Sequence, residues 1–161
     1  MVSVPIEERI AIQELSNLYP LYCDTRHYDK LVELFTEQCV FDESVVGAPS
    51  VAKSKAQLRE VFREAEPRLG PLMHICTNHI ISAFSGTTAS GMCHVLAEGA
   101  FIINGEEHPF RIRGYYDDRY AKIGGRWYFT SRILKLLVPS QGSAPTIGGI
   151  TYDTGSPHFK I

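Results

Sequence analysis

The second half of the chain limits the fold most, because it consists of four long apolar runs in succession. The runs span 72–84, 89–103, 110–123 and 126–138. Turn residues separate them, and the clearest is Asn104-Gly105, the strongest short signal for a two-residue hairpin. Strands this long are typically twisted, bulged and curved. The sequence therefore predicts a curved antiparallel sheet built from neighbouring strands.

The first part of the chain has helical periodicity instead. Apolar residues recur at helical spacing from Ile6 to Tyr19 with charged residues between them, which is the pattern of an amphipathic helix. Pro20 is expected to kink or end this helix, because proline removes a backbone donor. A second, short helix is expected over 28–35.

A strand and a third helix complete the first part of the chain. The strand is expected over 39–46, followed by a loop at 47–50. Ser54 is a candidate N-cap for the third helix, and Gln57 stands at the capping-box position. Helices segregated from a run of antiparallel strands predict the α+β class. Residues 1–138 would form one domain, and the Gly-, Ser-, Pro- and Thr-rich tail at 139–161 would serve as a lid over a pocket or as a clasp on another subunit.

Composition narrows the classes of partner. Hydrophobic residues make up 44% of the chain, charged residues 21%, and the net charge is −2, which is ordinary for a globular domain. Lysine and arginine are dispersed along the chain, so we expect neither a nucleic-acid nor a membrane partner. Without a signal-peptide pattern at the start, a cytoplasmic location is expected.

The cysteines and histidines do not form a metal-binding pattern. Cys23, Cys39, Cys76 and Cys93 lie in apolar stretches without metal-ligand spacing, so buried free thiols are expected. On a regular strand, His79 would face away from His74, because side chains alternate between faces. We therefore expect no metal site, and no cofactor.

Asp24 and His74 are the residues that point to chemistry. Asp24 closes the first helical pattern, and His74 opens the first long strand. A helix packed on the sheet would bring this carboxylate within reach of the imidazole, which would make a working base. The structural alternatives are a helix-terminus role for Asp24 and a core role for His74.

Several motifs together resemble a known family. They are Ala11-Ile12-Gln13-Glu14-Leu15, Asp24 followed by Tyr28-Asp29, His74-Ile75-Cys76-Thr77-Asn78, Gly114-Tyr115-Tyr116-Asp117, and Trp127 through Arg132. With them the chain resembles the SnoaL-like branch of the nuclear-transport-factor-2-like superfamily, which includes scytalone dehydratase, hexachlorocyclohexane dehydrochlorinase and ketosteroid isomerase. The resemblance implies a cone-shaped curved sheet with three N-terminal helices packed on its concave side.

The resemblance also implies roles for single residues. In the dehydratase and dehydrochlorinase members, an aspartate and a histidine at the positions of Asp24 and His74 form a pair in which the histidine acts as the general base. Arg132 is the nearest equivalent of a basic residue on the last strand of the dehydrochlorinase, and its strand phase is left open. His94 is the candidate for a second histidine, as in scytalone dehydratase.

Further substrate contacts are expected from polar side chains near the pair. Tyr22 and Tyr28 are candidate donors to a substrate oxygen, with core packing as the alternative for both. Asn78, with Asp24 and Arg132, would be needed to hold a water if the protein were an epoxide hydrolase. Asp117-Asp118 is expected to be solvated or at an interface, whereas Arg111 and Arg113 share a strand face that favours a subunit interface.

The resulting prediction is a cofactor-independent lyase or isomerase that uses a His–Asp base on a small apolar or aromatic substrate. Dehydration, dehydrohalogenation, isomerisation and cyclisation remain open, because one base serves all of them. The alternative is a non-catalytic small-molecule-binding or assembly domain, such as the small subunits of aromatic-ring dioxygenases. In either case we expect a homodimer or homotrimer.

Overall fold

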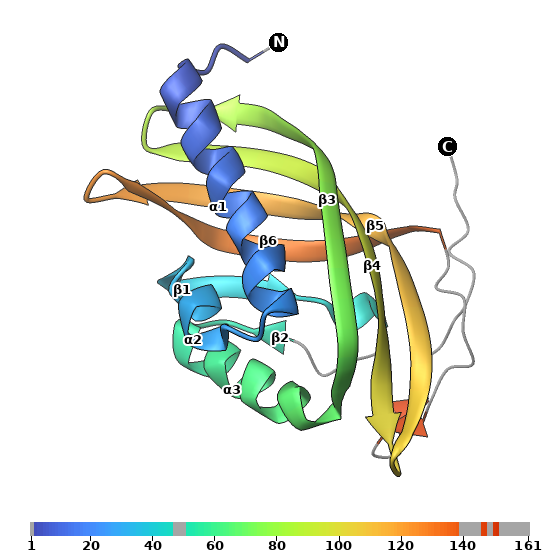
Figure 1. Cartoon of the computed structure of the whole chain (residues 1–161). Coiled ribbons are helices and arrows are strands. Elements are labelled where there is room, and N and C mark those ends of the chain that lie inside the picture. Colours follow the sequence, from blue (N-terminus) through green and yellow to red (C-terminus); the bar gives the residue numbers. More distant parts are fainter. Residues whose placement is uncertain (1, 47–50, 139–145, 148–149, 152–161) are drawn as a thin grey trace.

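Long β-hairpins dominate the computed structural model, which describes residues 2–46, 51–138, 146–147 and 150–151. Three α-helices and a six-stranded sheet make up the domain (Figure 1). The helices are α1 (Ile6–Asp24), α2 (Tyr28–Val32) and α3 (Lys55–Ala65). The strands of the sheet are β1 (Phe35–Asp42), β2 (Val51–Ala52), β3 (Leu69–Phe84), β4 (Thr88–Ile103), β5 (Glu106–Ile123) and β6 (Arg126–Val138). Two 3-10 turns, η1 (Ser44–Val46) and η2 (Glu66–Arg68), complete the domain.

The strand order is β2-β1-β6-β5-β4-β3. Sequential hairpins join β3 to β6, and every pair is antiparallel except β1 with β6, which is parallel. The predicted α+β class and the curved sheet are confirmed, but the expectation of antiparallel pairing throughout is wrong at β1. Hairpins impose antiparallel pairing only on neighbours along the chain, whereas β1 and β6 are separated by α3 and four strands.

Two of the tight turns follow from their residues. Asn104 and Gly105 have φ values of +54° and +83°, and Gly124 and Gly125 have +58° and +83°. Positive φ at both central positions is the requirement of a type I′ turn, whose twist matches that of the flanking strands. The predicted hairpins at these dipeptides are therefore confirmed.

The helix α1 continues past Pro20 to Asp24, so of the two predicted effects of the proline, a kink or an end, the end is wrong. Proline costs one intrahelical hydrogen bond, but Tyr19, Pro20 and Cys23 are buried, and their packing keeps the last turn helical. The Thr25 hydroxyl donates to the Leu21 carbonyl oxygen at 2.6 Å and satisfies one of the terminal acceptors.

The connection after α1 differs from the prediction in register. Helix α2 stops at Val32, and β1 begins at Phe35 rather than at residue 39, because Phe35 pairs with Phe129 of β6. Short apolar runs are ambiguous between helix and strand, and here the sheet decides. The predicted cap of α3 is confirmed, since the Ser54 hydroxyl accepts from the Gln57 N–H.

The helices lie on one side of the sheet, and α1 crosses the long strands β3 and β6 (Figure 1). The buried core between helices and sheet includes Ile12, Tyr19, Leu31, Phe35, Leu58 and Phe129. At the far end of the helix, Glu8 accepts from Trp127 Nε1 at 2.7 Å and from Lys122 Nζ at 2.6 Å. These contacts fix α1 at its first turn, so its last turn is held at a set place over β3.

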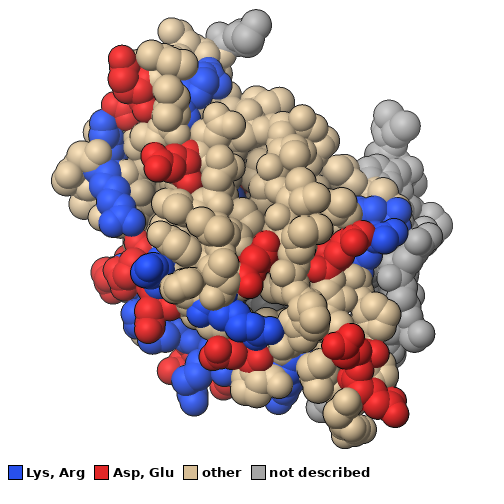
Figure 2. All heavy atoms as spheres, in the orientation of Figure 1, with Lys and Arg blue, Asp and Glu red and all other residues tan. Residues whose placement is uncertain are grey.

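Charged side chains of both signs are interspersed on the face shown in Figure 2. Within the described part of the chain, no helix is both long and apolar enough to span a membrane. The predicted loop at 47–50 lies outside the described residues. The predicted tail also does, apart from β7 (Thr146–Ile147) and β8 (Ile150–Thr151), which pair with each other.

Candidate functional site

Asp24 and His74 make two hydrogen bonds to each other across the helix–sheet contact. Asp24 Oδ1 lies 2.7 Å from Nδ1 of His74, and Asp24 Oδ2 accepts from the His74 backbone N–H at 2.8 Å. The side chains retain 21% and 10% of their exposure respectively. The predicted contact is therefore present, and both of its side chains are partly exposed.

This geometry determines which ring nitrogen is available. An ionised carboxylate can only accept hydrogen bonds, so Nδ1 of His74 carries a proton in the pair. In the neutral ring, Nε2 then holds the lone pair and can act as a base. Because both Asp24 oxygens bind the same residue, the carboxylate fixes the backbone and the ring of His74 together.

The chain after α1 holds the pair in place. Arg26 adopts a left-handed conformation, with φ at +56°, and its Nη2 donates to the carbonyl oxygens of Leu69 and Gly70 at 2.8 Å each. These bonds tie the end of α1 to the first residues of β3. The two Arg26 hydrogen bonds therefore help to position Asp24 and His74, in addition to the contact between the two residues.

Glu43 joins the same region, although no sequence motif indicated it. Its Oε1 accepts from the hydroxyls of Tyr19 and Tyr116, each at 3.2 Å. Burial raises the pKa of Glu43, against the lowering effect of the nearby His74 charge and of the two hydroxyl donors. Its one signal in the sequence is an acidic residue directly after the apolar strand that ends at Phe41-Asp42.

Arg132 faces the interior, which resolves its open strand phase. It is fully buried and pairs directly across the strands with Asp118, Nε to Oδ1 at 2.9 Å and Nη2 to Oδ2 at 2.8 Å. Its guanidinium carbon lies 4.1–4.4 Å from the ring centroids of Tyr19, Tyr116 and Phe129. The Nη1 atom is buried without a hydrogen-bond partner among the described residues.

The expectation that Asp117-Asp118 is solvated holds for only half of the dipeptide. Asp117 pairs at the surface with Arg119, whereas Asp118 has no exposed surface and balances the buried Arg132 charge. Alternation along β5 sends the two neighbours to opposite faces. Arg132 and Asp118 thus support the site from within the core, behind the rings of Tyr19 and Tyr116.

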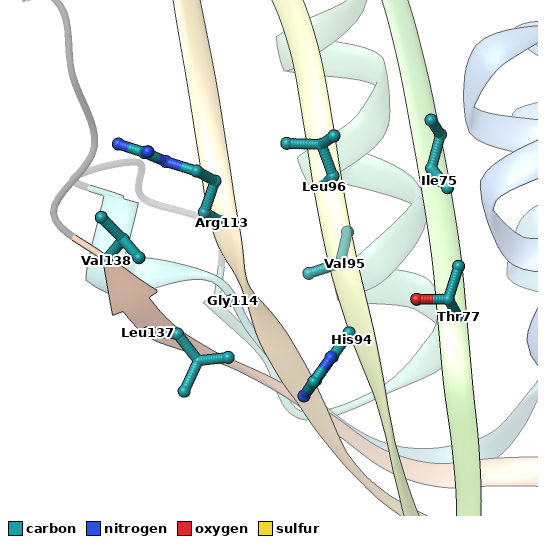
Figure 3. A pocket seen from close by; sticks show the side chains of 9 residues that line it. All are labelled: Ile75, Thr77, His94, Val95, Leu96, Arg113, Gly114, Leu137 and Val138. Atoms are coloured by element: carbon teal, nitrogen blue, oxygen red, sulfur yellow. The ribbon is translucent and has the colours of Figure 1, made fainter.

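Asn78 and His94 lie on the outer face of the sheet. Both are exposed, and Asn78 Nδ2 lies 3.0 Å from His94 Nδ1. The structure does not bring them to His74, whose side chain points to the helices. An open groove of about 300 Å³ on this outer face is lined by His94, Ile75, Thr77 and Leu96, together with residues of β5 and β6 (Figure 3).

The two tyrosines near the pair have separate surroundings. Tyr22 lies beside His27, with the Lys30 ammonium 6.0 Å from its ring centroid. Tyr28 stacks on Phe62 of α3 at 5.3 Å, and burial raises its pKa. Neither hydroxyl is hydrogen-bonded to His74, and the Tyr28 hydroxyl is buried without a hydrogen-bond partner among the described residues.

A β-bulge corrects the expected orientation of His79. Register shifts between Thr77 and Ile80, and Asn78 has a φ of +55°. The extra residue reverses the alternation of side chains, so His79 faces inward like His74. Its Nε2 lies 3.1 Å from the Tyr120 hydroxyl, which in turn donates to Asp118 at 2.9 Å.

The cysteines follow the expectation of free thiols. All of Cys23, Cys39, Cys76 and Cys93 are free thiols, and Cys76 alone is not fully buried. A side-chain hydrogen bond with Cys76 lowers the pKa of Cys93. In the described ranges, no group of three or more His, Cys, Asp or Glu side chains is arranged to hold a metal ion.

Comparison with known proteins places this architecture in a family. Residues 4–133 match the family described as the SnoaL-like domain. A proposed aromatic ring hydroxylase from Novosphingobium aromaticivorans is similar at 28% identity and a TM-score of 0.80, over 87% of this chain and 96% of that chain. No match was found among curated proteins.

Two further solved structures share the fold at lower identity. A proposed scytalone dehydratase from Novosphingobium aromaticivorans is 24% identical, with a TM-score of 0.74 over 85% of this chain and 88% of that chain. A hexachlorocyclohexane dehydrochlorinase from Novosphingobium barchaimii is 20% identical, with a TM-score of 0.70 over 82% and 88%. These similarities confirm the fold expected from the motifs.

Proposed function

Because the chain belongs to the SnoaL-like domain family, we propose that it is a cofactor-independent lyase or isomerase that acts on a small, mainly apolar substrate. The observation that carries the proposal is the two-point contact between Asp24 and His74. Two of the similar structures are named as a dehydratase and a dehydrochlorinase. At 24% and 20% sequence identity these structures show only a shared fold. The proposed activity therefore rests on the Asp24–His74 pair.

In the proposed reaction, Nε2 of His74 removes a proton from a carbon next to an activating group. The Asp24 carboxylate stabilises the imidazolium that forms and keeps the ring oriented. Loss of a leaving group from the neighbouring carbon, or return of the proton elsewhere, completes an elimination or an isomerisation. Tyr22 and Tyr28 are the candidate substrate contacts. The buried Arg132 packs against the rings of Tyr19 and Tyr116 and so supports the site from below.

Proton exchange in heavy water tests the base without knowledge of the natural substrate. Cyclic ketones with a hydroxyl or a halogen beside the acidic carbon are incubated with the protein, and deuterium uptake and alkene formation are followed by NMR. We expect exchange by the wild type and a loss of about 10²–10⁴-fold in His74→Gln and in Asp24→Asn, the usual contribution of a general base.

His108→Gln is the matched control, since His108 lies at the far end of β5, beside the β4–β5 turn. This variant should exchange at the wild-type rate. Equal rates in the wild type and in His74→Gln would contradict the proposal.

A second candidate is a non-catalytic binding or assembly domain. The similarity to a protein named as an aromatic ring hydroxylase supports aromatic compounds as the ligand class of such a domain. In that case, small aromatic compounds would bind without exchange or elimination. Binding measured by calorimetry, together with absent turnover, would favour this candidate over the lyase.

A further inference from the structure

Glu43 is a carboxyl group inside the fold that the proposed base does not use. It directly follows β1, where Asp42 Oδ1 accepts from the Ser44 backbone N–H at 2.9 Å and from the Ser44 hydroxyl at 2.6 Å. This side-chain turn bends the chain at the end of the strand. The bend turns Glu43 inward, to the hydroxyls of Tyr19 and Tyr116.

The hydrogen bonds around Glu43 use one of its two oxygens and leave the other free to carry a proton. Both tyrosine hydroxyls donate to Oε1, and Oε2 makes no hydrogen bond within the described part of the chain. A protonated carboxyl group has one accepting oxygen and one O–H donor. Oε1 is the acceptor in this arrangement, which leaves Oε2 to carry the proton and offer it to a bound molecule.

The charges around Glu43 act in both directions. Burial raises its pKa most strongly, while the His74 and Arg132 charges and the tyrosine donors lower it, and the net effect is a raised pKa. The bidentate Asp118 contact already neutralises Arg132. The titratable groups that face Glu43 from the packed elements are Tyr19, Cys23, His74, Tyr116 and Arg132.

Resting on the proposed function, we propose that Glu43 is the general acid that protonates an oxygen leaving group while His74 removes the C–H proton. The substrate class is then a β-hydroxy carbonyl compound. The Cα–H bond breaks and its proton passes to Nε2 of His74. The electron pair forms the Cα–Cβ double bond, the Cβ–O bond breaks, and the oxygen takes the Glu43 proton and leaves as water.

The same two groups restore the starting state. After one turnover His74 is an imidazolium and Glu43 is a carboxylate. Transfer of one proton from His74 to Glu43 then regenerates both groups, so no other reactant is consumed. A halide leaves without a proton, and therefore the need for Glu43 separates hydroxyl from halogen leaving groups.

Infrared difference spectroscopy tests the protonated carboxyl without any substrate. Spectra of the wild type and Glu43→Gln are compared at neutral pH. We expect the wild type to show the C=O stretching band of a protonated carboxylic acid, and Glu43→Gln to lack it. The pH dependence of this band in wild-type protein with labelled glutamate gives the same answer if the variant folds poorly. Absence of the band at neutral pH would overturn the proposal.

Kinetics with two leaving groups test the catalytic role. The probes are 3-hydroxycyclohexanone and 3-chlorocyclohexanone, which give the same enone. We expect Glu43→Gln to slow the hydroxyl compound by about 10²–10⁴-fold and to keep both chloride elimination and deuterium exchange close to wild type. Glu37→Gln is the matched control on β1, because its side chain is 82% exposed, and it should behave as wild type with both probes.

The outcomes separate this proposal from the proposed function. If the wild type neither exchanges protons nor eliminates, the lyase function fails and the role of Glu43 fails with it. If the wild type is active but Glu43→Gln slows both probes equally, or neither, the base stands and the role of Glu43 as leaving-group acid is overturned.

Discussion

Arg132 is a fully buried ionisable side chain and Glu43 is a partly buried one, and their surroundings favour opposite charge states. Arg132 keeps its charge because Asp118 accepts two hydrogen bonds from it and three aromatic rings surround it. Glu43 receives only neutral hydroxyl donors and has no paired cation at hydrogen-bond distance. A buried acid without such a partner favours its neutral form.

The raised pKa of Glu43 predicts how stability depends on pH. The folded state holds the Glu43 proton to a higher pH than the unfolded chain does. Its contribution is therefore complete below the unfolded pKa and is lost as pH rises through the folded pKa. We expect the unfolding free energy of the wild type, relative to Glu43→Gln, to fall as pH is raised from about 4.

Asp42 provides the comparison of opposite sign. Hydrogen bonds from Ser44 lower the Asp42 pKa, so its contribution is present above the unfolded pKa and is lost as pH falls. The stability difference between wild type and Asp42→Asn should shrink toward acid pH. Urea unfolding at several pH values measures both differences, and the same slope for the two variants would contradict the assignment.

For single residues, the sequence predicted the Asp24–His74 pair but not the acidic residues that support it, Glu43 and Asp118. Asp24 and His74 were predicted because each is polar within an apolar stretch and the family motifs include both. Glu43 and Asp118 each follow another aspartate and belong to no motif, and their inward position depends on the local course of the chain. Only the observed register places Asp118 opposite Arg132.

Strand β3 shows that sequence separation does not always predict which face of a strand a side chain takes. The bulge at Asn78 sends both His74 and His79 inward, although an odd separation predicts opposite faces. Similarly, the sequence indicated the four long strands and their turns but not the parallel pairing of β1 with β6. Turn residues specify local hairpins, whereas pairing between distant segments is decided by packing.

The bulge makes a prediction about stability. Valine at position 78 would have to adopt a positive φ, which costs a β-branched residue roughly 1–2 kcal/mol. We expect Asn78→Val to lower the unfolding free energy by about that amount, and the control Thr77→Val, on the adjacent exposed position, to change it little. Equal stability of the two variants in urea unfolding would show that the left-handed conformation at Asn78 is not required.

For the whole molecule, we propose that the outer face of β3 and β4 is the contact of a homodimer or homotrimer. Met73, Ile75, Ile80 and Met92 are each at least 40% exposed on this face, and the groove in Figure 3 continues it to β5 and β6. Exposed apolar side chains that are contiguous mark interaction surfaces. The expected interface contribution of Arg113 agrees with its place in this groove.

Light scattering after gel filtration tests this assembly. We expect the wild type to have two or three times the mass of one chain, and Ile75→Arg to have the mass of one chain, because a charge would be buried in the contact. Ile10→Arg is the control, since Ile10 is 56% exposed on α1. A wild-type monomer, or an unchanged oligomer in Ile75→Arg, would contradict the proposed contact.

The central claim is that Asp24 holds His74 with Nδ1 protonated and Nε2 available as the base. Long-range ¹H–¹⁵N NMR of the imidazole reports which nitrogen carries the proton, measured at about pH 8, above the free imidazole pKa of roughly 6.5. We expect protonated Nδ1 and unprotonated Nε2 in the wild type, and a changed tautomer distribution in Asp24→Asn. A proton on Nε2 in the wild type, or the same spectrum in both proteins, would contradict it.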